Sequence, residues 1–311
     1  MKIIFMGTPR FAVPSLNALL NAGHEIACVI TQPDKPSGRG RGEAEPPIKT
    51  AARLAGIRVI QPASLKDVNL TAQVRGFGAE LIAVVAYGKI LPEAMLNIPP
   101  KGCVNLHASL LPKYRGAAPI NRAIINGDTQ TGVCTMLMDK GMDTGAVFLT
   151  EKTDIGAEET AGELSARLAE IGAKLLSKTI GLIEKSGITA IPQNEKEASY
   201  ATPLKKEDGK IDWQKPSIKI HCLMRGASPW PGAYAYLNGE RIKIYSGKAL
   251  TEAVPSKLTP GLVITAGPDS VKVMCGDGIF EILELQAEGK RRLSARDFLK
   301  GFRISAGDTF Q

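Results

Sequence analysis

Short apolar runs alternate with helix-like segments over the first 107 residues, and this alternation constrains the fold more than any other feature. The run Glu80–Ala86 is continuously apolar after its first residue, which is typical of a strand whose sheet is covered on both faces. The predicted strands are 2–6, 25–31, 58–60, 80–86 and 102–106, and the predicted helices are 14–20, 48–54 and 69–77. This alternation predicts a doubly wound, mostly parallel α/β sheet.

The character of the sequence changes after residue 185. A long amphipathic helix is predicted over 160–185, and the polar stretch 193–208, which lacks a period, is typical of a linker. Beyond it, Asn238-Gly239 is a strong hairpin signal. The short strands predicted there are 233–237, 241–246, 261–265, 270–274 and 279–286. They favour a small barrel or sandwich, and an OB-like barrel is one option. We therefore expect an α/β domain over 1–189, a linker over 190–206 and a β domain over 207–311.

Composition sets further bounds on the class of protein. The 311 residues include 44% hydrophobic residues, and the net charge is +8 with a pI near 9.2, which suggests a polyanionic partner. Residues 1–190 hold 21 Lys and Arg against 17 Asp and Glu, and residues 191–311 hold 18 against 14, so the C-terminal part is the more basic per residue. The N-terminus lacks a signal-peptide pattern and no apolar run is long enough to span a membrane, which favours a cytoplasmic protein.

The five cysteines carry no pairing pattern. Their number is odd, none forms a C-x-x-C pair, and most lie in apolar runs. We expect buried, reduced thiols rather than a disulfide framework. The cysteines are Cys28, Cys103, Cys134, Cys222 and Cys275.

The most unusual chemistry lies between Val104 and Gly145. Asn105 and His107 are two residues apart at the end of a predicted strand, so their side chains share one face. That end of an open parallel sheet is where ligands bind. An amide that stabilises an oxyanion and an imidazole that handles a proton suit acyl transfer. A lone histidine is otherwise usually structural, and no partners for a metal are visible beside it.

An acidic loop follows the Asn105/His107 segment. Asp143 lies between Gly141 and Gly145, where it is either a turn residue or a carboxylate that orients His107. On geometry alone Asp139 is its rival. The intervening segment 109–116 contains Pro112 and Gly116 and forms a shaped loop, in which Arg115 is either a fork for a carboxylate or a helix-capping charge.

These residues together carry a family resemblance. Asn105-x-His107, Ser109-Leu-Leu-Pro-x-x-Arg115-Gly116 and Asp143 resemble the signature of the formyltransferases that use 10-formyltetrahydrofolate, and the resemblance extends over the whole chain. It implies a Rossmann-like catalytic domain over 1–189 and supports an OB-like, tRNA-binding barrel over 207–311. The implied reaction is formyl transfer to the α-amino group of an initiator methionyl-tRNA by a monomer, with neither metal, nicotinamide nor membrane. Asn105, His107 and Asp143 are the implied catalytic residues.

The resemblance also implies binding residues, which the residue pattern alone does not single out. Folate is expected at the apolar strand end, where Leu81, Ile82 and 84–87 resemble part of the pterin pocket, and at the loop after His107. The expected folate contacts are Val85, Tyr87, Ser109, Leu110, Leu111, Pro112, Arg115 and Gly116. The expected substrate contacts are Phe11, Gly38 and Arg39. Phe11 would lie against the methionyl side chain, and Gly38 and Arg39 belong to a Gly/Arg loop that suits a phosphate backbone.

Three alternatives bear on function. Gly7-Thr-Pro9 lacks the later glycines of a dinucleotide-binding loop, and Pro9 lacks an N–H donor, which excludes a nicotinamide site there. A formyltransferase acting on a nucleotide sugar or another small amine would share the catalytic triple. A non-catalytic RNA-binding module is disfavoured by the intact triple. Lys205, Lys206, Lys210 and 241–248 are candidate RNA contacts or a solvated face.

Overall fold

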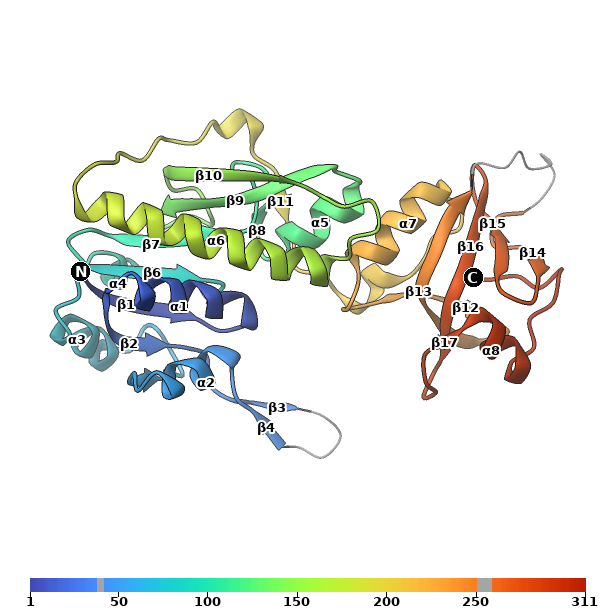
Figure 1. Ribbon diagram of the computed structural model, residues 1–311, viewed down its shortest axis with the longest axis horizontal. Coiled ribbons are helices and arrows are strands. Elements are labelled where there is room, and N and C mark those ends of the chain that lie inside the picture. The colour runs from blue at the N-terminus through green and yellow to red at the C-terminus, as the bar shows by residue number, and fades with distance from the viewer. Residues whose placement is uncertain (38–41, 251–258) are drawn as a thin grey trace. The chain divides into compact units, whose positions relative to one another are not determined.

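A computed structural model describes residues 1–37, 42–250 and 259–311. These residues form two compact units (Figure 1). Unit 1 comprises residues 1–119, 130–154 and 165–202, and unit 2 comprises residues 120–129, 155–164 and 203–311. The predicted sites Gly38 and Arg39 lie outside the described residues.

The centre of unit 1 is a seven-stranded sheet among the described residues, in the order β10-β9-β7-β6-β1-β2-β5. Its bounds are β1 (Lys2–Gly7), β2 (Glu25–Ile30), β5 (Val59–Ile60), β6 (Leu81–Val85), β7 (Cys103–His107), β9 (Gln130–Leu137) and β10 (Val147–Asp154). Strands β5, β2, β1, β6 and β7 are parallel, and β9 and β10 are antiparallel additions. The predicted doubly wound, mostly parallel sheet is confirmed, and β9 and β10 are strands that the sequence analysis did not identify.

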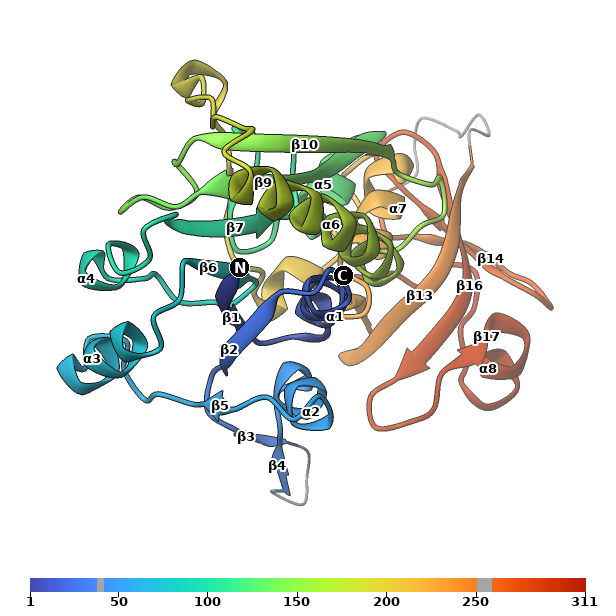
Figure 2. The same cartoon turned by 60° about the vertical axis from the view of Figure 1, so that its left-hand side comes forward.

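Helices cover both faces of this sheet. Figure 2 shows α1 and α6 on one face and α3 and α4 on the other. Their bounds are α1 (Val13–Asn21), α2 (Pro47–Leu54), α3 (Val68–Gly76), α4 (Glu93–Leu96) and α6 (Ala161–Glu184). Gly172 lets α6 approach β7, because a Cβ at that position would lie 2.6 Å from a methyl carbon of Leu106. On the other face, Leu70 and Val74 of α3 pack with Ile4 and other buried residues of the sheet. This double cover explains why the central strands are continuously apolar.

Short elements complete unit 1. A hairpin of β3 (Lys35–Ser37) and β4 (Gly42–Ala44) follows β2, and β8 (Arg115–Gly116) pairs in parallel with β11 (Tyr200–Ala201). The segment that carries β11 also contains η2 (Glu195–Glu197). It belongs to the stretch 190–206 that the sequence predicts as a linker, and residues up to 202 lie within unit 1.

Unit 2 is built on an antiparallel sheet, in the order β12-β13-β16-β15-β14 with β17 beside β16. Its bounds are β12 (Ala233–Leu237), β13 (Glu240–Leu250), β14 (Val263–Ala266), β15 (Val271–Met274), β16 (Ile279–Ala287) and β17 (Leu293–Ser294). The C-terminal residues Asp308–Gln311 hydrogen-bond to Tyr236 at one edge and to Gly261 and Val263 at the other. The tail thus closes the sheet in the manner of a barrel, and the predicted C-terminal β domain is confirmed.

Unit 2 also contains α5 (Pro119–Asn126) apart from Pro119, together with α7 (Ser217–Gly226), α8 (Ala295–Gly301) and the turn η3 (Lys206–Gly209). The amide of Asn121 in α5 donates to the carbonyl of Gly226 in α7 at 2.8 Å. The barrel core gathers around buried aromatic residues, where Trp213 packs on Phe280 and Phe310. Within the described ranges, no helix is long and apolar enough to cross a membrane.

Candidate active site

Strand β7 places the two leading catalytic candidates. Its neighbours are β6, which is parallel, and β9, which is antiparallel, so β7 is supported on both edges. Asn105 is 9% exposed and His107 is 6% exposed. Among the described residues, the Asn105 side chain makes no hydrogen bond, and it is slightly exposed. An amide held in this way is available to donate to a ligand.

The hydrogen bond of His107 fixes which ring nitrogen carries a proton. Its Nε2 lies 3.0 Å from the carbonyl oxygen of Tyr114. Because a carbonyl only accepts, Nε2 is the protonated nitrogen. Nδ1 therefore faces the other way, 3.6 Å from Oδ2 of Asp143. The imidazole and the carboxylate thus form a close pair, with Nδ1 as the nitrogen that faces Asp143.

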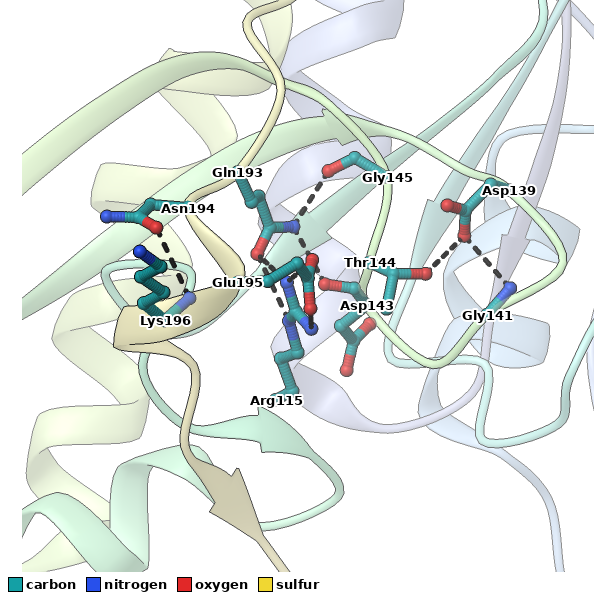
Figure 3. Close-up of polar contacts among 10 residues, drawn as sticks. All are labelled: Arg115, Asp139, Gly141, Asp143, Thr144, Gly145, Gln193, Asn194, Glu195 and Lys196. Carbon is teal, nitrogen blue, oxygen red and sulfur yellow. Dashed lines mark hydrogen bonds and ion pairs between the residues drawn. The ribbon is translucent and has the colours of Figure 1, made fainter.

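The loop between β9 and β10 brings Asp143, and not Asp139, to His107. Oδ2 of Asp143 also accepts from the backbone N–H of Gly116 at 2.8 Å. Asp139 instead accepts from the N–H of Gly141 and from the hydroxyl of Thr144, and so shapes the turn (Figure 3). The structure thus assigns the two acidic residues different places, a distinction that the sequence pattern leaves open.

Loop 109–116 folds back on its own chain. Ser109 is buried and its hydroxyl donates to the carbonyl of Lys113 at 2.6 Å. Arg115 is fully buried, and its guanidinium forks onto Glu195 with distances of 2.8 and 2.7 Å. Gly116 has φ +118°, and a Cβ there would lie 2.8 Å from the carbonyl of Ala201. The guanidinium of Arg115, which is predicted to contact folate, thus pairs with the carboxylate of Glu195.

Three further predicted binding residues lie at the carboxyl ends of β1 and β6, which are adjacent strands. Val85 ends β6 and is fully buried. Tyr87 is 1% exposed, and its hydroxyl has no hydrogen-bond partner within the described residues. Phe11 follows β1 in the short turn η1 (Arg10–Ala12) and is half-buried. Because β7 lies beside β6, these residues and His107 belong to the same edge of the sheet.

The sequence analysis missed several residues at this site. Gln193 and Glu195 contact Arg115, and Gln193 also contacts the Asp143 loop. Ser199 accepts from the N–H of Tyr114 at 2.9 Å. They lie in a polar, aperiodic stretch, and no local signal distinguishes them from linker residues.

The cysteines bear on the class of chemistry. All five are free and buried, as the sequence predicts. Cys134 of β9 pairs in register with His107, and burial raises the pKa of its thiol to about 12. A thiol in that state is a poor nucleophile near neutral pH. In the described ranges no cluster of three or more His, Cys, Asp or Glu side chains could hold a metal ion.

Comparisons with known proteins identify the family. Residues 1–180 match the family model for formyl transferases, and residues 203–303 match the model for the formyl transferase C-terminal domain. The chain therefore belongs to the formyl transferase family, which confirms the resemblance found in the sequence.

The similarity to individual relatives runs from end to end. The methionyl-tRNA formyltransferase of Alkaliphilus oremlandii is 50% identical over 99% of this chain and 99% of its own length. That of Pelotomaculum thermopropionicum is 48% identical over 99% and 97%. A solved N-formyltransferase from Helicobacter canadensis, in complex with folinic acid and dTDP-3-aminofucose, has a TM-score of 0.66. It is 20% identical and covers 94% of this chain and 100% of that chain, which shows a shared fold.

Proposed function

We propose that the protein transfers the formyl group of 10-formyltetrahydrofolate to the α-amino group of initiator methionyl-tRNA, giving N-formylmethionyl-tRNA for translation initiation in the cytoplasm. The observation that carries this proposal is the pairing of His107 and Asp143, with Asn105 two residues before His107 on the same strand. The near-full-length identity to methionyl-tRNA formyltransferases supports the choice of acceptor.

The residues of the sheet edge suit a folate. The hydroxyl of Tyr87 is buried without a hydrogen-bond partner among the described residues, and the adjoining end of β6 is apolar, as the surroundings of a flat ring often are. Val85, Tyr87 and the backbone of loop 109–112 are the proposed contacts. Gly116 donates its N–H to Asp143 and Arg115 pairs with Glu195, so we propose that these two residues shape the loop that faces the folate. Bound here, the folate supplies an activated formyl group.

Asn105, His107 and Asp143 each have a distinct role in the proposed reaction. The α-amine attacks the formyl carbon, a C–N bond forms to the amine, and the C–N bond to the folate breaks. Asn105 donates to the formyl oxygen as negative charge develops on it. A proton leaves the amine and ends on the departing folate nitrogen. Nδ1 of His107, with Asp143 beside it, takes part in that transfer, because Nε2–H is committed to Tyr114.

The proposed tRNA-binding domain is residues 207–311, with Lys205 and Lys206 just before it as additional contacts. Lys205, Lys206 and Lys210 are exposed. The guanidinium of Arg241 lies 4.0 Å from the ring centroid of Tyr234, and the ammonium of Lys210 lies 5.7 Å from that of Tyr236. Cations stacked on aromatic rings in this way are candidates for contacts with phosphates. The proposed substrate contact Phe11 belongs to unit 1, and the proposed contacts Gly38 and Arg39 lie outside the described residues.

The test is direct formylation. The pure protein is incubated with 10-formyltetrahydrofolate and methionyl-tRNA, and formylmethionine is measured after hydrolysis of the ester. We expect His107→Ala and Asp143→Ala to lower kcat by about 10²–10⁴-fold. Asn105→Ala should lower it by about 10²–10³-fold, while the melting temperature stays near that of the wild type.

Glu93→Ala is the matched control, because Glu93 is an exposed carboxylate in α4. It should retain full activity. A folded Asp143→Ala enzyme with normal activity would contradict the catalytic assignment. Formylation of a nucleotide-linked amino sugar, but not of methionyl-tRNA, would overturn the proposed acceptor and leave the proposed chemistry intact.

A further inference from the structure

The segment 191–202, which we name the strap, lies along the catalytic loops of unit 1. It begins at Ile191, whose backbone pairs with Val147, and ends in β11, which pairs with β8. Between these two ends, the side chains of Gln193, Glu195 and Ser199 contact residues that are far away in sequence. Figure 3 shows Gln193 and Glu195 of the strap beside Arg115 and the Asp143 loop.

Gln193 bridges two elements of the site. Its Nε2 donates to the backbone carbonyls of Asp143 at 2.8 Å and Gly145 at 2.7 Å. Its Oε1 accepts from Nε and Nη2 of Arg115 at 3.1 and 2.8 Å. Because carbonyls only accept and the guanidinium only donates, the amide has one orientation that satisfies all four contacts.

Arg115 and Glu195 in turn fix the orientation of the Gln193 side chain. The Arg115 side chain is fully buried, and both of its terminal nitrogens contact Glu195. This bidentate pair holds the pKa of the Glu195 carboxyl below its usual range. The guanidinium is thereby fixed with its remaining edge toward Gln193. Glu195, Arg115 and Gln193 thus form a chain of contacts that links the strap to the loop carrying Asp143.

The far end of this chain of contacts is the backbone of a proposed catalytic residue. Asp143 has φ +55°, a left-handed conformation that a non-glycine residue keeps only when its surroundings enforce it. The carbonyl contacts of Gln193 are part of that enforcement. The strap also reaches the other partner of the pair, since Ser199 holds the N–H of Tyr114, whose carbonyl accepts from His107.

We propose that Gln193 is a positioning residue, which sets the separation of the Asp143 carboxylate and the His107 imidazole by holding the carbonyls of Asp143 and Gly145. This inference deepens the proposed function and rests on it for the identity of the reaction. Gln193 itself contacts neither the carboxylate of Asp143 nor the imidazole of His107. It acts by keeping Asp143 in place, and a displacement of about 1 Å at such a site costs on the order of 10²-fold in rate.

The first experiment separates kcat from KM in two variants. Gln193→Ala removes all four contacts, and Gln193→Glu keeps the acceptor for Arg115 but removes the donor to both carbonyls. We expect both to lower kcat by about 10- to 100-fold and to leave KM for both substrates within about threefold. Gln193→Glu preserves the pairing of Arg115, so it also serves if Gln193→Ala fails to fold.

Asn194→Ala is the matched control. Its amide contacts only Lys196 and Glu197 within the strap, among the described residues. It should behave like the wild type. Wild-type kcat in both Gln193 variants, or an equal fall in Asn194→Ala, would overturn the proposal.

The second experiment needs no turnover. The chain has three histidines, so ¹⁵N-labelled histidine gives a spectrum of three imidazoles, and His107→Ala assigns the signal of His107. Gln193→Glu should shift the ring nitrogens of His107 and leave those of His24 and His221 unchanged. An unmoved His107 signal would contradict the positioning role. A shifted signal in a protein that formylates no methionyl-tRNA would uphold the positioning role and reject the proposed function.

Discussion

The central strands of unit 1 and the strap are attached to the molecule by different forces. Strands β1, β6 and β7 lie between two helical layers, and their side chains are almost entirely buried. The strap is largely exposed. It is held by hydrogen bonds in which Gln193 donates and Glu195 and Ser199 accept. Apolar burial fixes where the strands lie, whereas directional bonds fix how the catalytic loops are turned. We therefore expect damage to the strands to appear in stability and damage to the strap to appear in kcat.

The largest expected change in stability comes from the core. Phe5 in β1 is fully buried between β2 and β6. Phe5→Ala should lower the free energy of unfolding by about 3–5 kcal/mol, through lost burial and the cavity left behind. Urea unfolding followed by far-UV circular dichroism measures this change.

Leu54→Ala is its control, because Leu54 is 85% exposed at the end of α2 and should cost within about 0.5 kcal/mol. Both tryptophans, Trp213 and Trp230, belong to unit 2, so tryptophan fluorescence in the same titration reports on that unit separately. A cost for Phe5→Ala no larger than that of a strap substitution would break the contrast between strands and strap.

The same contrast explains what the sequence alone could predict. The central strands are continuous apolar runs, and Asn105 and His107 follow from the end of one of them. Strand-end placement is thus a local property that the sequence carries. The family resemblance, rather than any pattern, selected Asp143 over Asp139.

The strap could not be predicted because its bonds are not local. Gln193 and Arg115 are 78 positions apart, and Ser199 and Tyr114 are 85 apart. Polar side chains without a period are equally typical of a solvated linker. Only the folded chain shows that Arg115 pairs with Glu195. The domain limits 1–189 and 207–311 and the individual folate and tRNA contacts stay predictions.

A smaller change is expected at Ser199. Its hydroxyl accepts the N–H of Tyr114, and Tyr114 holds His107. Ser199→Ala should cost about 1 kcal/mol of stability, the usual net value of one hydrogen bond. Because the position of His107 loosens as well, kcat should fall by about 3- to 10-fold. Thermal unfolding and steady-state formylation measure the two effects on one preparation.

Ser64→Ala is the matched control for Ser199→Ala. The Ser64 hydroxyl also accepts a backbone N–H, that of Lys66, but it is exposed and remote in sequence from every site residue. Its removal should leave kcat unchanged. If the two serine variants lowered kcat equally, the strap would have no special link to His107.

The smallest expected effect is the dependence of stability on pH at the Arg115–Glu195 pair. The guanidinium of Arg115 holds the pKa of the Glu195 carboxyl below its usual value of 4.5. A carboxyl whose folded-state pKa is depressed contributes stability that is fully present above the unfolded pKa and is lost as the pH falls through the folded pKa. The contribution of this pair should therefore be constant near neutrality and decline below about pH 4.5.

Glu195→Gln isolates this contribution from those of the other carboxyls, because it leaves the remaining acidic groups unchanged. The difference in melting temperature between wild type and Glu195→Gln should be largest near neutral pH and should shrink as the pH falls toward about 3. It should stay small throughout, since the Glu195 side chain is 68% exposed and water screens the pair. A large difference in melting temperature between wild type and Glu195→Gln would mean that the strap, like the central strands, contributes strongly to the stability of the fold. A small difference that accompanies a marked fall in kcat would show that the pair orients Gln193 and contributes little to holding the fold together.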